Sequence, residues 1–585
     1  MTIFRAPVNE TMFVLDDVLG IGTETRSSVF ANLDPDTVRA ILNQAATLAE
    51  TVLHPLNARG DRQGCTRNED GTVRTPAGFD VAYAKFVDEG WLAAGGSSAH
   101  GGQEMPSVLT LAFQEYFWSA NCSLTMYLRH LGHAELLLAY GTPEQQRTYV
   151  PELISGRWSG AMGLTEPQAG SDLGLVLTRA SSTADGSYRI TGSKMFTSGG
   201  EHDLTENIVH LVLARIDGSP TGTRGLSLFL VPKFLPDASG RPGVRNAVHC
   251  VGVEHKMGLR GSATCVMTFD GATGYLVGKS ERGLAAMFVL MNHTRLSTAV
   301  QALGMSEIAY QNAAAHVRER LQGRTPGGAR RPELVADPLV TQPDVRRILL
   351  GIRSFNESAR ALVLWTALQS DLAKLSTDSA SRDNAAARVS LLTPVLKGMI
   401  AETAFDNAVA AQQLFGGHGY ITDTGVDQFV RDVRMSAIGE GVTAIQAHDL
   451  VHRKIGQANG SVLEDLLAEI EGEVRSAGES WKQEPMRTAL DHLRVATATV
   501  RSQTPEEAAA GAVHYLNLFG RVTLGWMWLR LLRAAENGTA DSEALAARRT
   551  IGRSFLQTLP TYTEMRASLI AVGSTGLMEL PDHRF

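Results

Sequence analysis

The sequence contains few cysteines and no arrangement that indicates a disulfide framework. Its four cysteines, Cys65, Cys122, Cys250 and Cys265, are scattered through 585 residues without a Cys-x-x-Cys spacing. A disulfide-stapled secreted scaffold is therefore not indicated, and reduced thiols in the cytoplasm are expected. The first twenty residues also lack a basic start followed by a long apolar run, so no signal peptide is predicted.

Long hydrophobic runs and excess positive charge are also missing. The most apolar late segment, "YLNLFGRVTLGWMWLRLL", is interrupted by Arg521 and Arg530, so no membrane span is predicted. Lys plus Arg number 54 and Asp plus Glu number 61, which gives a net charge of −7. This balance argues against a broad nucleic-acid-binding face or an anionic-membrane face.

The common nucleotide and hydrolase motifs are absent as well. There is no Gly-x-x-x-x-Gly-Lys-[Ser/Thr], no Gly-x-Gly-x-x-Gly between a strand and a helix, and no Gly-x-Ser-x-Gly. His130 and His133 have a spacing that two helical metal ligands could use, but the neighbouring acids do not complete a site, and His418 stands alone. We predict no metal site, and no cofactor bound by a Rossmann unit.

The hydrophobic pattern changes character along the chain. It is helical up to about residue 160, with Thr142 and Pro143 as a helix start. Short runs rich in Val, Ile, Thr, Phe and Tyr follow and predict an antiparallel β barrel or sandwich: "GSYRITGSKMFTSGG", "NIVHLVLARI", "GLSLFLVPKF", "VHCVGV" and "ATCVMTFDGATGYLVG". Helical periodicity then resumes. The predicted domains are an N-terminal helical domain (1–160), a middle β domain (161–280), a four-helix bundle (281–458) and an appended helical domain (459–585).

Three stretches suggest a binding site, although each also has an ordinary explanation. "KMFTSGG" places Phe196 and Ser198 on one side of a strand, where an aromatic ring and a hydroxyl could flank a planar ligand. A half-buried strand explains the same pattern. "QLFGGHGY" has Gly416 and Gly417 after a helical run, where backbone N–H groups could bind an anion, or where the helix simply ends.

The third stretch, "MSAIGEGVTAIQAHDL", places Glu440 between Gly439 and Gly441 among small and apolar residues. Glutamate ordinarily stays in water, and glycine inside a helical pattern is costly. A surface helix cap is the common explanation of such a turn. A carboxylate that faces a bound substrate is the alternative.

Six stretches, in this order, resemble the acyl-CoA dehydrogenase family. They span roughly residues 30 to 455 and are "LTEPQAGSD", "KMFTSGG", "MNHTRLSTAVQALG", "HVRERLQGR", "QLFGGHGY" and "EGVTAIQ". The family fold is an N-terminal helical domain, a middle β domain and a C-terminal four-helix bundle, in agreement with the pattern above. The extra C-terminal block resembles the larger members, such as 3-methylthiopropanoyl-CoA dehydrogenases and long mycobacterial-type acyl-CoA dehydrogenases.

The resemblance implies an FAD cofactor between the β domain and the bundle. Thr165 and Ser198 are expected to hydrogen-bond the flavin ring, and Phe196 is expected to pack beside it. The pyrophosphate and adenosine of FAD in a neighbouring subunit are expected to contact Arg320, Gln413, Gly416 and Gly417. The chain is therefore expected to form at least a homodimer, or a homotetramer.

For the substrate, the resemblance implies that Ser171 contacts CoA and that Arg295 belongs to the substrate site. Glu440 is expected to take the α-proton of an acyl-CoA thioester while the β-hydrogen leaves as hydride to flavin N5, giving the trans-2-enoyl-CoA. The Glu440 N–H and a flavin ribityl hydroxyl are expected to stabilise the thioester oxygen. Electron-transfer flavoprotein is the expected acceptor.

The catalytic loop departs from the family at two positions. Gly439 replaces a usual aromatic residue, and Val442 replaces a usual threonine whose hydroxyl contacts FAD. These departures keep two alternatives open. One is a flavin oxidase or monooxygenase that uses oxygen on the same fold, and the other is a non-enzymatic relative that binds a partner through its extra helices.

Overall fold

The computed structural model describes residues 2–21, 30, 33–538 and 542–585. Contacts divide the chain into two compact units. We call the first the β unit, and it comprises Leu48–Met105 and Ala120–Thr294. The second, the helical unit, comprises Met1–Thr47, Pro106–Ser119 and Arg295–Phe585.

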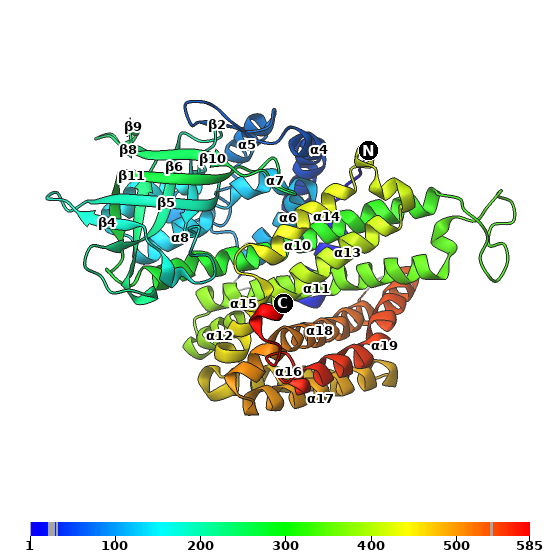
Figure 1. The fold of residues 1–585 in the computed structure, drawn as a ribbon. Coiled ribbons are helices and arrows are strands. Elements are labelled where there is room, and N and C mark those ends of the chain that lie inside the picture. Colours follow the sequence, from blue (N-terminus) through cyan, green and yellow to red (C-terminus); the bar gives the residue numbers. More distant parts are fainter. Residues whose placement is uncertain (1, 22–29, 31–32, 539–541) are drawn as a thin grey trace. The chain divides into compact units, whose positions relative to one another are not determined.

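A seven-stranded sheet dominates the β unit (Figure 1). Its strands follow the order β10-β11-β5-β4-β6-β3, and β7 pairs with both β11 and β6. Pairing therefore runs in a ring from β11 through β5, β4, β6 and β7 back to β11, which closes part of the sheet as a barrel. The strands are β3 (Trp158–Gly163), β4 (Arg179–Ser182), β5 (Tyr188–Ser198), β6 (Asn207–Ile216), β7 (Leu226–Pro232), β10 (Val248–Val253) and β11 (Thr264–Val277).

The predicted middle β domain is confirmed in its class, with one difference in strand direction. Most pairings are antiparallel, but β6 pairs with β3 and with β4 in parallel. Parallel neighbours need long crossover connections, and nothing in the local sequence of a strand reports the direction of a distant partner. Two small hairpins complete the strands: β1 (Thr66–Arg67) with β2 (Val73–Arg74), and β8 (Phe234–Pro236) with β9 (Pro242–Arg245).

Short helices accompany the sheet in the β unit. The predicted helix start at Thr142 is confirmed: its side chain accepts a hydrogen bond from the Gln145 N–H, the Gln145 side chain returns the interaction, and Pro143 occupies the first turn. The elements are a π-turn (Ala49–Leu53), α4 (His54–Gln63), α5 (Phe79–Asp88), α7 (Cys122–Thr125), α8 (Leu131–Tyr140) and α9 (Pro143–Ser155).

The helical unit contains the predicted bundle helices together with helices of the predicted N-terminal domain. The buried Arg360 guanidinium bonds Glu115 at 2.6 Å and Glu307 at 3.2 Å, which ties three of these helices together. The helix α10 (Gly283–Glu319) supplies residues to both units. The others are α1 (Val8–Phe13), the π-turn η1 (Val14–Val18), α3 (Pro35–Leu48), α6 (Ser107–Ala120), α11 (Pro343–Leu375), α12 (Ser379–Val395), the π-turn η8 (Leu396–Ile400), α13 (Ala401–Gln413), α14 (Asp427–Ile438), α15 (Thr443–Asp449) and the π-turn η11 (Leu450–Lys454).

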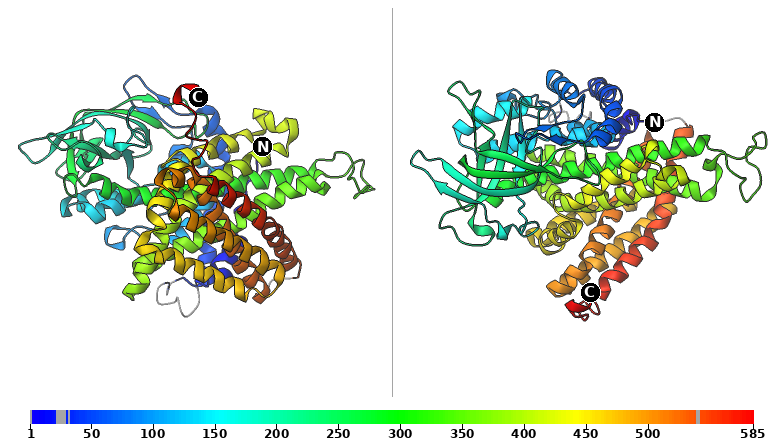
Figure 2. Two further views of the ribbon diagram at one scale, coloured as in Figure 1. Left: turned by 60° about the horizontal axis from the view of Figure 1, so that its bottom comes forward. Right: turned by 45° about the horizontal axis from the view of Figure 1, so that its top comes forward.

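Four further helices follow the bundle and belong to the same compact unit (Figure 2). They are α16 (Ser461–Ser476), α17 (Ser480–Ser502), α18 (Pro505–Asn537) and α19 (Ser542–Val572). Trp526 of α18 packs edge-on against Trp365 of α11 at 5.0 Å, and the Trp528 indole N–H donates to the Ser354 carbonyl. Within the described part of the chain, no helix combines the length and the apolar character that crossing a membrane requires.

Candidate active site

The turn that carries Glu440 has a defined backbone conformation and is not a frayed helix end. Helix α14 ends at Ile438 and α15 begins at Thr443. Between them Glu440 has φ 58° and Gly441 has φ 87°, both in the left-handed region. A β-carbon on Gly441 would meet the Gln446 Nε2 at 2.9 Å. The left-handed conformation is unfavourable for glutamate, so surrounding contacts must hold it.

Two side chains hold the backbone of this turn. The Lys397 ammonium on η8 donates to the Gly441 carbonyl at 2.5 Å. The Gln446 amide on α15 donates to the Glu440 carbonyl at 3.1 Å and to the Gly441 carbonyl at 3.2 Å. Both side chains are fully buried. The left-handed turn is therefore fixed by hydrogen bonds from two separate elements.

Positive charge surrounds the half-buried Glu440 carboxylate. Burial lowers the pKa of Lys397 to about 8, and the charge of Glu440 acts in the opposite direction. Burial also lowers the pKa of Arg295, while Asp449 and Glu440 oppose that effect. The Arg295 guanidinium lies 3.5 Å from the Asp449 carboxylate. The structure thus brings two predicted site residues, Glu440 and Arg295, into one charged cluster, with Lys397 as a member that the sequence did not single out.

The space beside Gly439, where the family resemblance leads one to expect an aromatic residue, is occupied by a side chain of α14. A β-carbon at Gly439 would lie 2.5 Å from the Met435 sulfur, so the methionine side chain occupies the space beside this glycine. Gly439 itself has φ −68° and needs no left-handed freedom. Glycine at this position therefore allows Met435 to pack against the turn.

Four of the predicted FAD residues lie at two adjoining places in the helical unit. Arg320 directly follows α10, and Gly416 opens the 3-10 turn η9 (Gly416–Tyr420) three residues after Gln413 ends α13. His316, on the last turns of α10, stacks on Phe415 at 4.4 Å. This contact brings the end of α10 beside the glycine turn. The exposed predicted residues here are Arg320, Gln413, Gly416 and Gly417.

The glycine turn is open to a ligand. Gly416 has φ 55°, and neither Gly416 nor Gly417 has any atom within 4 Å of where a β-carbon would lie. Burial lowers the pKa of His316, and His418 and Arg320 contribute to the same effect through their charges. An open glycine backbone with cationic side chains beside it suits a phosphate-type anion.

The other predicted residues lie in the β unit. Phe196 sits where β5 bulges against β11; it has φ 55° and is 58% exposed, unusual for such a large aromatic side chain. The Met195 N–H donates to the Thr165 carbonyl at 2.9 Å, so the segment of Thr165 runs beside this strand. Ser198 ends β5 and is half-buried, whereas Ser171 is exposed in the turn after Thr165.

A buried ion pair joins the two motifs of the β unit. Lys194 on β5 bonds the Glu166 carboxylate at 2.8 Å, and both side chains are buried. The Glu166 carboxylate also accepts from the Leu177 and Thr178 N–H groups. Burial works against its ionisation, but Lys194 and these hydrogen bonds outweigh burial and lower the pKa of Glu166 to about 2.

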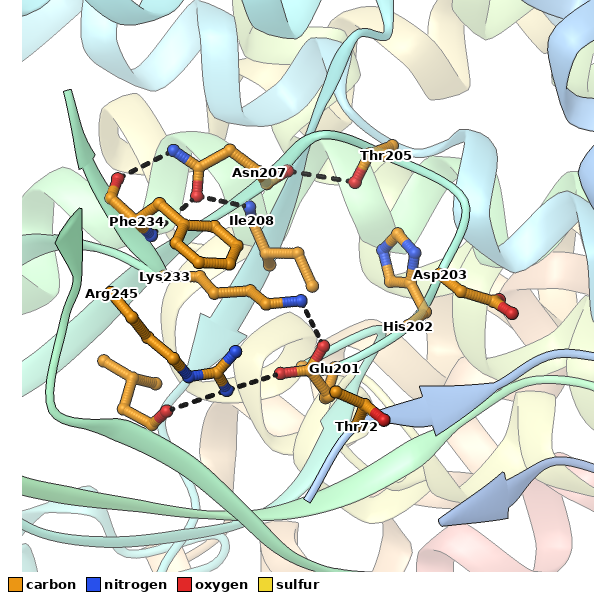
Figure 3. A network of polar contacts seen from close by, with 12 residues as sticks. Thr72, Glu201, His202, Asp203, Thr205, Asn207, Ile208, Lys233, Phe234 and Arg245 are labelled. Carbon is orange, nitrogen blue, oxygen red and sulfur yellow. Dashed lines mark hydrogen bonds and ion pairs between the residues drawn. The ribbon is translucent and has the colours of Figure 1, made fainter. Parts of the chain in front are cut away.

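A second buried network follows Ser198 along the chain (Figure 3). The Glu201 carboxylate lies between Lys233 and Arg245, bonds both, and is almost fully buried. The Phe234 ring lies 5.4 Å from the Lys233 ammonium and 5.5 Å from the Arg245 guanidinium. This network anchors the chain directly after the strand end that carries Phe196 and Ser198.

The histidines that the sequence raised as metal ligands have other surroundings. His130 hydrogen-bonds the Tyr83 hydroxyl at 2.9 Å, and His133 packs so close to Gly160 that a β-carbon there would lie 2.3 Å from the ring. Burial lowers the pKa of both imidazoles to about 3. In the part of the chain that the structure covers, no three His, Cys, Asp or Glu side chains come together as a ligand set.

Family models match nearly the whole chain. The matched descriptions are "Acyl-CoA dehydrogenase, N-terminal domain" (35–157), "Acyl-CoA dehydrogenase, middle domain" (161–272), "Acyl-CoA dehydrogenase, C-terminal domain" (281–455) and "Acetyl-CoA dehydrogenase C-terminal like" (466–581). The 3-methylmercaptopropionyl-CoA dehydrogenase of Ruegeria pomeroyi is 40% identical over 570 residues, 95% of both chains. The chain belongs to the acyl-CoA dehydrogenase family.

Other relatives agree with this assignment. The broad-specificity linear acyl-CoA dehydrogenase FadE5 of Mycobacterium tuberculosis is 33% identical over 615 residues and the full length of both chains. Among solved structures, Caenorhabditis elegans ACDH-11 in complex with C11-CoA matches with a TM-score of 0.78 at 20% identity, over 99% of this chain and 96% of that one. An acyl-CoA dehydrogenase of Bacillus anthracis complexed with FAD matches with a TM-score of 0.75 at 18% identity, over 94% and 90%. These structural matches confirm the fold.

The residues present fit the FAD that acyl-CoA dehydrogenases use. The open backbone at Gly416 and Gly417, with Arg320 and His316 beside it, provides donors and positive charge for a pyrophosphate. The exposed Phe196 ring beside Ser198 provides an aromatic face and a hydroxyl for a planar ring system.

Sequence reasoning missed three side chains that organise the site. Lys397 stands alone in the apolar run "LLTPVLKGMI", a pattern that could have marked it as a buried charge with a distant partner. Lys194 occupies an inward-facing strand position, which could have indicated an acid such as Glu166. Nothing local marks Gln446, whose role depends on the fold of the turn before it.

Proposed function

We propose that this acyl-CoA dehydrogenase removes the α-proton of an acyl-CoA thioester with the Glu440 carboxylate, giving the trans-2-enoyl-CoA. The observation that carries the proposal is the Glu440 turn, a left-handed carboxylate-bearing turn held by Lys397 and Gln446 among buried positive charges. The left-handed turn costs conformational free energy and holds the Glu440 side chain in one orientation. Such a cost is expected at a functional residue and not at a surface helix cap.

Charge and position suit Glu440 for the role of a base. A carboxylate takes up a proton only when it is ionised, and the Lys397 and Arg295 cations lie near enough to the Glu440 carboxylate for their charges to interact with it. The turn fixes the direction of the side chain, and a positioned base contributes about 10²- to 10⁴-fold to proton abstraction. The Glu440 N–H is proposed to donate to the thioester oxygen, where negative charge develops as the proton leaves.

FAD, when bound, supplies the acceptor for the β-hydrogen and its electron pair. Thr165, Phe196 and Ser198 are proposed to hold its ring system. Arg320, Gln413, Gly416 and Gly417 are proposed to hold its pyrophosphate and adenosine from a neighbouring copy, so that the working enzyme is a homodimer or homotetramer. Ser171 and Arg295 are proposed to contact the CoA thioester, and electron-transfer flavoprotein is the proposed electron acceptor.

The names of two relatives suggest which substrates to test first. One is named for 3-methylmercaptopropionyl-CoA and the other for linear acyl-CoA substrates. We propose a short unbranched acyl-CoA, with or without sulfur in the chain. A panel of 3-methylmercaptopropionyl-CoA, butyryl-CoA and octanoyl-CoA separates these possibilities.

Anaerobic reduction of the bound flavin tests this function. FAD-loaded protein is mixed with each acyl-CoA, and loss of the visible absorbance of oxidised flavin is followed with time. Glu440→Gln keeps the size of the side chain but cannot act as a base, so it should retain FAD and reduce at least about 100-fold more slowly. Glu464→Gln, which changes an exposed carboxylate on α16, is the matched control and should behave as the unaltered protein.

Other outcomes point to other functions. Full reduction by the Glu440→Gln protein would overturn the assignment of the base. Steady release of peroxide in air during acyl-CoA turnover would identify an oxidase or monooxygenase instead. Failure of every acyl-CoA to reduce the flavin would favour a binding role for the chain.

A further inference from the structure

Lys397 is a buried cation in an otherwise apolar helical run. Its side chain has no exposed surface, and it lies on η8, the π-turn that follows Pro394. Burial of an ammonium group is costly unless hydrogen bonds and opposite charge compensate for it. A leucine would be buried here at a lower cost in free energy, so the lysine must make an interaction that a leucine cannot make.

The compensation comes from the turn that carries Glu440. The Lys397 ammonium donates to the Gly441 carbonyl at 2.5 Å, across 44 residues of sequence. The neighbouring Gly398 allows this approach, because a β-carbon there would lie 2.9 Å from Leu516 of α18 and 3.5 Å from Gln446 of α15. The π-turn is thus packed closely between α15 and α18, so the lysine is held in place.

Three charged groups act on the Lys397 ammonium. Burial lowers its pKa to about 8; Glu440 of the turn and Glu402 of α13 favour its charged form, and Arg295 of α10 disfavours it. The residues of α15 and α18 that pack against the neighbouring Gly398, Gln446 and Leu516, are uncharged. Glu440 is the largest favourable charge on Lys397, so the ammonium group and the Glu440 carboxylate attract each other.

We propose that Lys397 is a positioning residue for acyl-CoA dehydrogenation. It fixes the left-handed turn through the Gly441 carbonyl, which directs the Glu440 carboxylate, and it places a positive charge beside that carboxylate. The inference rests on the proposed function of Glu440 as the base. Lys397 itself touches neither substrate nor cofactor in this role.

Three substitutions separate the hydrogen bond from the charge. Lys397→Met removes both, Lys397→Gln keeps a donor without charge, and Lys397→Arg keeps both in a larger group. Misplacement of a reacting group by about 1 Å costs on the order of 100-fold in rate. We expect flavin reduction to slow about 100-fold in Lys397→Met, less in Lys397→Gln, and least in Lys397→Arg.

The pH profile of flavin reduction provides a readout that a merely structural lysine would not change. In the unaltered protein the rate should fall as pH rises through about 8, where Lys397 loses its proton. Lys397→Met and Lys397→Gln should lose this alkaline limb, because neither replacement side chain titrates. Lys397→Arg should move the alkaline limb to higher pH.

A readout independent of turnover is amide hydrogen exchange at residues 440–446 in the FAD-loaded protein without substrate. Lys397→Met should exchange faster there than the unaltered protein, and Lys397→Gln should lie between the two. Lys482→Met is the matched control, because Lys482 of α17 is also buried and its ammonium bonds the Glu536 carboxylate of α18 at 2.6 Å. It should lower thermal stability and leave the turn's exchange and the pH profile unchanged.

The outcomes distinguish this proposal from the proposed function. If Glu440→Gln abolishes reduction while all three Lys397 variants keep the rate and pH profile of the unaltered protein, Lys397 has no positioning role. If the flavin of the Glu440→Gln protein is still reduced fully, the proposed role of Glu440 as the base is wrong, whatever the Lys397 variants show. Should Lys397→Met not fold, the comparison of Lys397→Gln with Lys397→Arg still decides between charge and packing.

Discussion

Glu440 occupies a backbone conformation that glutamate ordinarily avoids, and its neighbours compensate for the cost. A non-glycine residue in the left-handed region costs about 1 kcal/mol or more. Hydrogen bonds from Lys397 and Gln446 to the two carbonyls of the turn each contribute about 1 kcal/mol or more, which is enough to offset it. The conformation thus depends on residues that are remote in sequence.

The Val442 departure leads to a prediction about stability. Val442 is the N-cap of α15, with ψ 160° and no side-chain capping bond. Threonine there can accept a hydrogen bond from the first-turn N–H groups, so Val442→Thr should stabilise the fold by about 0.5 to 1 kcal/mol.

Thermal unfolding of the FAD-free protein measures this change directly. Val442→Ser should act in the same direction through the same hydroxyl, whereas Val442→Ala should bring no gain. An unchanged melting temperature in both hydroxyl variants would show that the capping geometry is not reached. Tighter retention of FAD by Val442→Thr would further support the family role of this hydroxyl.

At the scale of elements, the Glu166–Lys194 ion pair joins a turn to a central strand of the barrel. The turn carries Thr165 and Ser171, and β5 carries Phe196 and Ser198. Because the pair is buried and supported by two backbone N–H groups, it fixes the turn relative to the strand. The relative placement of the proposed flavin-contacting residues therefore depends on this ion pair.

The lowered pKa of Glu166 predicts a pH dependence of stability. The pKa falls from an ordinary 4.5 to about 2 in the folded chain, so the pair stabilises the fold fully above about pH 4.5. That contribution, about 3 kcal/mol, is lost as pH falls from about 4.5 toward 2. Glu166→Gln removes it at all pH values.

Urea unfolding at several pH values between neutrality and about pH 3, which enters the range in which the contribution is lost, checks this prediction. The stability difference between the unaltered protein and Glu166→Gln should shrink as the medium becomes acidic. The exposed Glu144→Gln substitution serves as a control that should show no such trend. A difference that stays constant across this range would contradict the ionised state of Glu166.

At the scale of the whole molecule, the four appended helices are part of the packing of the helical unit. Helix α18 is buried along most of its length and meets α11 through Trp526 and Trp528. It also approaches η8, where Leu516 lies beside Gly398. The appended helices therefore support the element that carries Lys397.

Removal of these helices should be far more damaging than a single substitution. A chain that ends at Gly460 would expose Trp365 and the surface around Gly398, so we expect it to aggregate on expression. Trp528→Ala leaves the helices in place and should cost about 3 to 5 kcal/mol. Soluble yield and urea midpoints measure the two effects. A soluble, FAD-binding truncated chain would contradict this account.

The sequence predicted the element types and the order of the family motifs well. Hydrophobic periodicity identified the helices and the strands β5, β6, β7, β10 and β11, and the capping pattern located the start of α9 at Thr142. It overlooked the short strands β3 and β4, because their Ser, Gly and Ala residues have little strand propensity. The roles of the FAD and substrate residues stay predictions that the experiments above address.

Local sequence therefore determined what each segment becomes and which acid stands in the turn between α14 and α15, because periodicity, caps and motifs are properties of neighbouring residues. The tertiary structure determined which distant residues and strands contact one another. Only folding brings Lys397 to Gly441, Lys194 to Glu166 and β7 to β11, since each of these contacts depends on the packing of elements remote in sequence. Buried charges and buried backbone polar groups need such partners. No local pattern shows which residue each partner is.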